Sequence, residues 1–241
     1  MVKIRQCRFI SVLAMLVIGF TVLSCSKDND PSPEDDEALK AEVGSITGLG
    51  DVSGVPQGTP FTLPDGVTVD GTITGDDCED AVKHIGSGYY VTLCVALRND
   101  KDHEITVTFP GGLIFVSETD EYQNGVVVET TTIVLPPNKT TRFAFHTYCG
   151  NASRSAAYST AVYTFGPLTN SKLMERLVED LSRKKIEISD YWEDGDTTQA
   201  YDELEDTIQT LVWLITDSPN NMDWEAFENM YNQLLNELPN K

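Results

Sequence analysis

The central part of the chain, from about residue 45 to residue 168, consists of short apolar runs separated by turn residues. The runs are rich in Val, Ile, Thr, Tyr and Phe, and alternation is clearest at 89–97, where every second side chain is large and apolar. Short runs of this composition are typical of β-strands. The strands predicted from this pattern are 67–73, 89–97, 104–109, 113–117, 126–135 and 140–148, and Asn124-Gly125 indicates a hairpin.

After about residue 168 the apolar residues change to helical spacing. Such spacing gathers them on one side of a helix, where they form a core. The stripes are Leu173, Leu177 and Leu181; Leu204, Ile208, Leu211, Val212 and Ile215; and Trp224, Phe227, Tyr231, Leu234 and Leu238. The segment 169–241 is therefore predicted to form three helices.

The two patterns together predict an α+β fold. The segment 134–140, Val-Leu-Pro-Pro-Asn-Lys-Thr, resembles the strand–turn–strand of immunoglobulin-like bacterial modules. A sandwich of about seven strands fits the spacing of the turns. We expect an N-terminal immunoglobulin-like antiparallel β-sandwich at 45–168, followed by a three-helix C-terminal subdomain at 169–241 that packs on it. Whether these are one domain or two is left open.

The N-terminal 24 residues have the pattern of a secretory signal peptide. They carry Lys3, Arg5 and Arg8, no acid, and an apolar run at 9–23. This run is shorter than the roughly 20 residues that a membrane-spanning helix needs. We therefore expect residues 1–24 to be removed.

The junction Val22-Leu23-Ser24-Cys25 resembles the lipobox of bacterial lipoproteins. The resemblance implies that the Cys25 thiol receives a diacylglycerol, so that the partner of this end of the chain is a membrane. Ser26-Lys27-Asp28-Asn29-Asp30 looks like the acidic export tag of surface lipoproteins. We expect the protein at the outer membrane, lipid-anchored and surface-exposed, with residues 25–44 as an acidic flexible tether.

The charge of the chain excludes one class of partner. It has 38 acidic and 17 basic residues, a formal net charge of -21. A surface this negative repels phosphate backbones, so we expect no nucleic-acid binding.

The cysteines of the mature chain do not pair evenly. With Cys25 lipidated, Cys78, Cys94 and Cys149 remain. In an oxidising compartment two of them are expected to form a disulfide and one is left over. Cys78 and Cys94 are the candidate pair, although pairing of Cys149 with either is equally open from spacing. A lone Cys149 fits a buried structural cysteine.

Two short motifs resemble the thioester domains of bacterial surface adhesins. Tyr148-Cys149 matches an aromatic-Cys motif at a strand end, and Ile208-Gln209-Thr210-Leu211-Val212-Trp213 matches an aliphatic-Gln motif followed by Trp. The resemblance implies that the thiolate displaces ammonia from the Gln carboxamide, and that a partner amine then attacks the thioester. Such a bond needs shielding from water and a donor for the attacked carbonyl oxygen.

Other chemistry has little support in the sequence. Serine-hydrolase, zincin, P-loop and dinucleotide motifs are absent, and so is Cys-x-x-Cys spacing. His146 points away from Cys149 by strand parity. We expect no enzyme, no metal and no cofactor. The predicted function is a cell-surface binding or adhesion protein with a surface protein or glycan ligand and the candidate thioester Cys149–Gln209. The alternative is a non-covalent binding or structural envelope lipoprotein.

Overall fold

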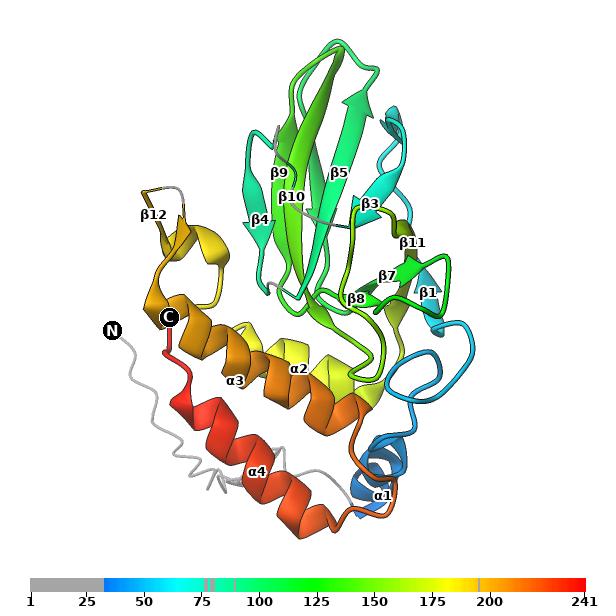
Figure 1. Cartoon of the computed structure of the whole chain (residues 1–241), viewed down its shortest axis with the longest axis vertical. Helices are drawn as coiled ribbons and strands as arrows, with labels where there is room; N and C mark the ends of the chain where they lie inside the picture. Colours follow the sequence, from blue (N-terminus) through cyan, green and yellow to red (C-terminus); the bar gives the residue numbers. More distant parts are fainter. Residues whose placement is uncertain (1–32, 76–77, 79–80, 89, 195) are drawn as a thin grey trace, which may run out of the picture. The chain divides into compact units, whose positions relative to one another are not determined.

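The computed structural model describes residues 33–75, 78, 81–88, 90–194 and 196–241 (Figure 1). The expected signal peptide, Cys25 and the start of the tether lie outside these residues. The described residues belong to one compact unit, Ser32–Lys241. They form a mixed α and β structure with mostly antiparallel sheets and, within these ranges, four α-helices.

The strands of the described part form one large sheet and two pairs. The strands are β1 (Gly58–Pro60), β2 (Val67–Val69), β3 (Ile73–Gly75), β4 (His84–Gly86), β5 (Val91–Asn99), β6 (Ile105–Phe109), β7 (Leu113–Ser117), β8 (Gly125–Val126), β9 (Thr131–Leu135), β10 (Lys139–Cys149), β11 (Val162–Thr169), β12 (Trp192–Glu193) and β13 (Asp196–Thr197). The large sheet has the order β2-β5-β3-β11-β7-β8-β10-β4, with β1 on β11. The pairs are β6–β9 and β12–β13.

Six strands of the large sheet close into a barrel-like ring. The ring runs β5-β3-β11-β7-β8-β10 and closes because β10 also pairs with β5. The β5–β10 ladder is antiparallel and extends from Asn99↔Lys139 to Val91↔Thr147. Every second side chain of β5 and β10 points into the ring, as the sequence alternation predicted. These inward side chains are fully buried (Val91, Leu93, Val95, Leu97, Phe143 and Phe145). Burial of this stripe therefore sets the register of the two longest strands.

Two predicted strands are each divided in the structure. The stretch 67–73 becomes β2 and the start of β3, and Gly71 between them has a φ of 90°, a left-handed value that favours glycine. The stretch 126–135 becomes β8, which joins the ring, and β9, which pairs with β6 outside it. Each division lets one predicted strand supply two different positions in the sheets.

The expected disulfide is confirmed. Cys78 and Cys94 are bonded, with their Cα atoms 4.9 Å apart. The bond ties the segment before β4 to the middle of β5. Cys149 is the free cysteine among the described residues.

The helices are α1 (Pro33–Glu42), α2 (Lys172–Leu181), α3 (Gln199–Thr216) and α4 (Trp224–Glu237), with a 3₁₀ turn at Ile188–Asp190. Helices α2, α3 and α4 lie within the predicted helical segment. The structure differs from the expected flexible tether at 33–44, because α1 occupies most of it. The Glu42 carboxylate accepts hydrogen bonds from the backbone N–H groups of Lys172 (3.0 Å) and Leu173 (2.9 Å) and from the Ser171 hydroxyl (2.6 Å). These bonds at the start of α2 hold the end of α1 in place.

The helices share one core with the end of the ring. The apolar stripes of α2, α3 and α4 pack with Ile114, Val126 and Tyr148 from the strands. Figure 1 shows α2 and α3 running across the end of the long strands. Tyr148 is therefore enclosed between β10 and the helices, next to the strand end that carries Cys149.

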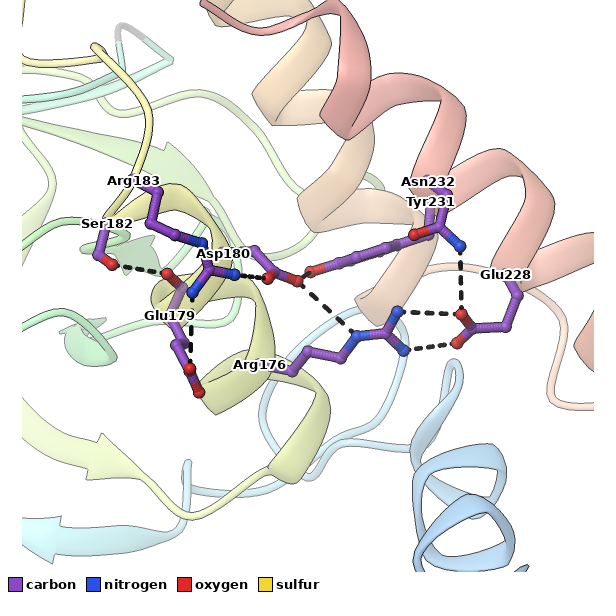
Figure 2. Close-up of polar contacts among 8 residues, drawn as sticks. All are labelled: Arg176, Glu179, Asp180, Ser182, Arg183, Glu228, Tyr231 and Asn232. Carbon is purple, nitrogen blue, oxygen red and sulfur yellow. Dashed lines mark hydrogen bonds and ion pairs between the residues drawn. The ribbon is translucent and has the colours of Figure 1, made fainter. Parts of the chain in front are cut away.

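An ion-pair network joins α2 to α4 (Figure 2). Arg176 binds both carboxylate oxygens of Glu228, at 2.5 and 2.9 Å, and its guanidinium carbon lies 4.4 Å from the centroid of the Tyr231 ring. The Tyr231 hydroxyl donates to Asp180 at 2.9 Å, and Asp180 also pairs with Arg183. Because a bidentate pair fixes both distance and orientation, the network sets how α4 lies against α2.

Candidate functional site

The side chain of Gln209 is hydrogen-bonded to the backbone of Cys149. The Cys149 N–H donates to Gln209 Oε1 at 2.8 Å, and Gln209 Nε2 donates to the Cys149 carbonyl at 2.9 Å. Cys149 is fully buried and Gln209 is 1% exposed. The structure thus brings the two residues of the candidate thioester together, although 60 positions separate them in the chain.

The apolar side chains of α3 fix how this helix packs, and the packing places Gln209 at the end of β10. Ile208, Leu211, Val212 and Ile215 are buried in the helical core. Gln209 lies beside this stripe, and Trp213, one helical turn later, packs against the core of the ring. The same helix therefore faces two cores, and Gln209 lies where they meet.

The thiol of Cys149 points into the ring core. It shares a strand face with Phe143 and Phe145, as parity predicted, and belongs to their apolar cluster. Burial raises the pKa of the Cys149 thiol to about 11, although the Asn151 N–H, 3.4 Å from Sγ, lowers it. The thiol is therefore protonated near neutral pH.

The turn after Cys149 is fixed by the buried side chain of Asn151. Its Nδ2 donates to the carbonyl of Gly50 at 2.9 Å, and its Oδ1 accepts from the Asn124 N–H at 3.0 Å. The Gly50 N–H donates to the Gly150 carbonyl at 2.7 Å. These bonds tie the turn to two other loops, so the thiol is held in one position relative to Gln209.

Trp213 and Tyr90 lie over the pair on the side of α3. The Trp213 indole N–H lies beside the sulfur and favours the thiolate, but it does not reach hydrogen-bonding geometry, and Nε1 is buried with no hydrogen-bond partner. The Tyr90 ring lies 5.9 Å from the Trp213 ring between centroids, and its hydroxyl donates to Asp206 at 3.2 Å. Tyr90 is 39% exposed, so it forms the outermost part of this cover.

His146 lies on the opposite face of β10 from Cys149, as predicted. Its Nε2 is 2.9 Å from Nδ1 of His84, whose ring stacks on Trp192 with centroids 4.1 Å apart. Burial, together with His84, lowers the pKa of His146 to about 3. His146 is therefore neutral and belongs to a separate aromatic stack.

The site contains features that the sequence did not reveal. The backbone N–H of Cys149 donates to the Gln209 side-chain oxygen, a bond that no side-chain pattern could indicate. Tyr90 and Asp206 meet across 116 positions of the chain. For Asn151 the sequence indicated only a turn at Gly150-Asn151 and not the hydrogen bonds of its side chain.

Two further observations concern the described residues alone. No group of three or more His, Cys, Asp or Glu side chains there is arranged to hold a metal ion. None of the helices in these ranges has the length and apolar character needed to span a membrane.

Comparison with known proteins gives this chain no relative: no family model, no curated protein and no solved structure matches it.

Proposed function

We propose that the protein is a lipid-anchored cell-surface binding protein in which Cys149 and Gln209 form an internal thioester that a partner amine attacks. One observation carries the proposal: the two hydrogen bonds between the Gln209 carboxamide and the backbone of Cys149, at 2.8 and 2.9 Å, in a buried position. These bonds hold the Gln209 carboxamide against the backbone of the residue whose thiol would attack it, which supports the proximity that this chemistry requires.

The bond-forming step balances with the groups at the site. The Cys149 sulfur attacks the Gln209 amide carbon, and the Cys149 N–H stabilises the negative charge that develops on Oε1. The carbon–nitrogen bond then breaks, and the nitrogen leaves as ammonia with the proton of the thiol. An incoming amine later forms a carbon–nitrogen bond at the same carbon, and the released sulfur takes a proton from that amine.

Burial around the pair supports the shielding that such a bond needs. Cys149 is fully buried among the side chains of the ring, where Trp213 also packs, and Gln209 is 1% exposed. Water competes with a partner amine for a thioester, so a covered site favours the amine that can displace the cover.

The finer fold assignment belongs to the same proposal. We propose an immunoglobulin-like sandwich with a three-helix subdomain at 169–241. The β6–β9 pair supports a second layer, because Val107 and Phe109 of β6 and Ile133 and Leu135 of β9 share one apolar cluster with β5 and β10. The ring closure through β3, β11, β7 and β8 is a departure from a simple sandwich.

The proposed location of the protein rests on its N-terminal sequence. We propose that residues 1–24 are removed, that Cys25 carries the lipid, and that the acidic residues after it lead to an outer-membrane surface. More than one buried acyl chain gives stable anchoring, whereas a single chain is marginal. A surface protein or a glycan is the ligand class that fits this location.

Intact mass tests the thioester directly. The protein is produced from residue 26 onward, which keeps the compact unit Ser32–Lys241. The Cys78–Cys94 disulfide removes two hydrogens from every variant, so masses are compared with the sequence mass of the disulfide-bonded form. We expect the wild type to be lighter than this mass by one ammonia, and Cys149→Ala and Gln209→Ala to have the full mass of their own sequences. A wild-type protein of full sequence mass, unreactive toward methylamine, would refute the thioester.

The alternative is a non-covalent binding or structural lipoprotein. In that case Gln209 is a clamp that joins α3 to the end of β10 through its own donor and acceptor. The raised pKa of the Cys149 thiol favours this alternative, because a protonated thiol is a poor nucleophile. It predicts that ligand binding survives Cys149→Ala.

A further inference from the structure

We propose that Tyr90 and Asp206 form the entrance to the Cys149–Gln209 site, with Asp206 binding the positive charge of a primary amine and Tyr90 covering the path. This inference rests on the proposed thioester and names the residues that select its partner.

Tyr90 lies at the same end of the ladder as Cys149. The last register pair of β5 and β10 is Val91↔Thr147, so Tyr90 and Cys149 both lie just beyond it. Tyr90 is 39% exposed, while Cys149 is fully buried. Tyr90 is thus a solvent-facing residue at the strand end that carries the thiol.

Trp213 lies between this outer residue and the reactive pair. Its ring is 5.9 Å from that of Tyr90, and its indole nitrogen is buried beside the Cys149 sulfur without a hydrogen-bond partner. An indole N–H buried without an acceptor carries a free-energy cost that a bound group with a lone pair would relieve. Displacing Tyr90 would open this layer toward solvent.

Asp206 lies on the same face of α3 as the two inner residues. Asp206, Gln209 and Trp213 are at i, i+3 and i+7, which are neighbouring positions on one side of a helix. Asp206 is exposed, and the Tyr90 hydroxyl donates to its Oδ1 at 3.2 Å. An ammonium group that takes this place on the carboxylate would release Tyr90 and lie about one helical turn from the amide carbon.

This arrangement defines the chemical class of the partner. A cationic primary amine on an unbranched alkyl chain can pair with Asp206 and pass its methylene groups along the rings of Tyr90 and Trp213. The bound ammonium gives one proton to solvent, and the neutral amine then leaves Asp206 and attacks the acyl carbon. The carbon–sulfur bond breaks, and the Cys149 sulfur takes a second proton from the attacking nitrogen. Amines that carry a carboxylate are repelled by Asp206.

The experiment compares two amines of different charge at pH 7.5. Methylamine is cationic at this pH and hydroxylamine is neutral, so only the first should depend on the carboxylate. The chain from residue 26 is used as wild type, Asp206→Asn, Tyr90→Phe and Glu203→Gln. Glu203 is the matched control, because it lies on the same helix but lines a different hollow with Tyr191 and Leu238.

We expect Asp206→Asn to slow methylamine labelling about fivefold, the size of an exposed ion pair, and to leave hydroxylamine labelling unchanged. Tyr90→Phe loses the bond to Asp206 and should speed labelling by both amines. Glu203→Gln should match wild type. The ammonia loss, measured first on every variant, shows that the site has assembled.

The two proposals fail in different ways. If no ammonia is lost from wild type, the thioester is refuted and the entrance with it. If ammonia is lost from all four proteins but Asp206→Asn labels with methylamine as fast as Glu203→Gln, the entrance alone is refuted. Equal slowing of both amines by Asp206→Asn also overturns it, because that result indicates a change of structure and not of charge.

Discussion

The stability cost of Cys149→Ala distinguishes a covalent link from a hydrogen-bonded clamp. A thioester would join positions 149 and 209, which are 60 apart. In the chain-entropy model a link that closes a loop of this length is worth about 4 kcal/mol. Without the link, Cys149→Ala removes one buried sulfur and its contact with the Asn151 N–H. That loss costs about 1 kcal/mol.

Gln209→Ala gives the complementary measurement. Without a link, it deprives the buried Cys149 N–H and carbonyl of one hydrogen bond each, which costs about 2–5 kcal/mol. A clamp therefore predicts that Gln209→Ala is clearly more destabilising than Cys149→Ala. A thioester predicts that both variants cost at least about 4 kcal/mol, and that their double mutant is far from additive.

Urea unfolding followed by Trp fluorescence provides the assay. The methylamine-opened wild type is the best control, since it keeps almost every atom and loses only the link. We expect it to match Cys149→Ala within about 1–2 kcal/mol. If the intact protein lacks one ammonia and Cys149→Ala still costs less than about 2 kcal/mol, the loop-closure reasoning is wrong.

Three further predictions concern the scaffold. Cys94→Ala opens a loop of 16 positions and should lower the free energy of unfolding by about 3 kcal/mol. Reduction of the disulfide in the wild type should have the same effect, and equal stability of the oxidised and reduced protein would contradict this. Glu42→Ala removes the acceptor of three hydrogen bonds at the start of α2 and should lower the free energy of unfolding by about 2 kcal/mol. Glu42→Gln should have a stability between those of Glu42→Ala and the wild type. Thermal unfolding followed by circular dichroism measures both variants. Burial raises the pKa of Glu187 to about 7 from an ordinary 4.5, so the folded state holds the extra proton and stability falls as pH rises through this window. Glu187→Gln keeps an acceptor for the Gly86 N–H. Its free energy of unfolding should exceed that of the wild type by about 3 kcal/mol at pH 8 and equal it at pH 4. If the difference in stability between the two proteins is the same at both pH values, the raised pKa of Glu187 is refuted.

The parts of the fold that the sequence predicts well are those where burial alone sets the period. Strand β5 buries Val91, Leu93, Val95 and Leu97 on one face, and that face is visible as alternation in the sequence. Helices α2, α3 and α4 each bury a stripe at helical spacing. In both cases one local pattern carries the information.

The parts that the sequence missed depend on contacts between distant segments. Strand β11 contains Gly166 and Pro167, which interrupt a strand pattern, and its register against β7 shifts between Phe165 and Leu168. Helix α1 is acidic and only weakly amphipathic, and the sequence gives no sign of the bonds that join its Glu42 to the start of α2. Ring closure depends on the order of strands, which no single segment encodes.

The candidate site also combines residues that the sequence predicts with contacts that it does not. A resemblance of short motifs was enough to select Cys149 and Gln209, because each motif is local. The chemistry proposed between them depends on features that are not local: the backbone N–H that faces Oε1, the Asn151 turn and the Tyr90–Asp206 contact. A Gln that clamps a strand end and a Gln that is poised to acylate a thiol have the same sequence and the same two hydrogen bonds. They differ in whether the buried thiol, whose pKa is about 11, can give its proton to the leaving nitrogen, and that proton transfer is the step on which the proposed function depends.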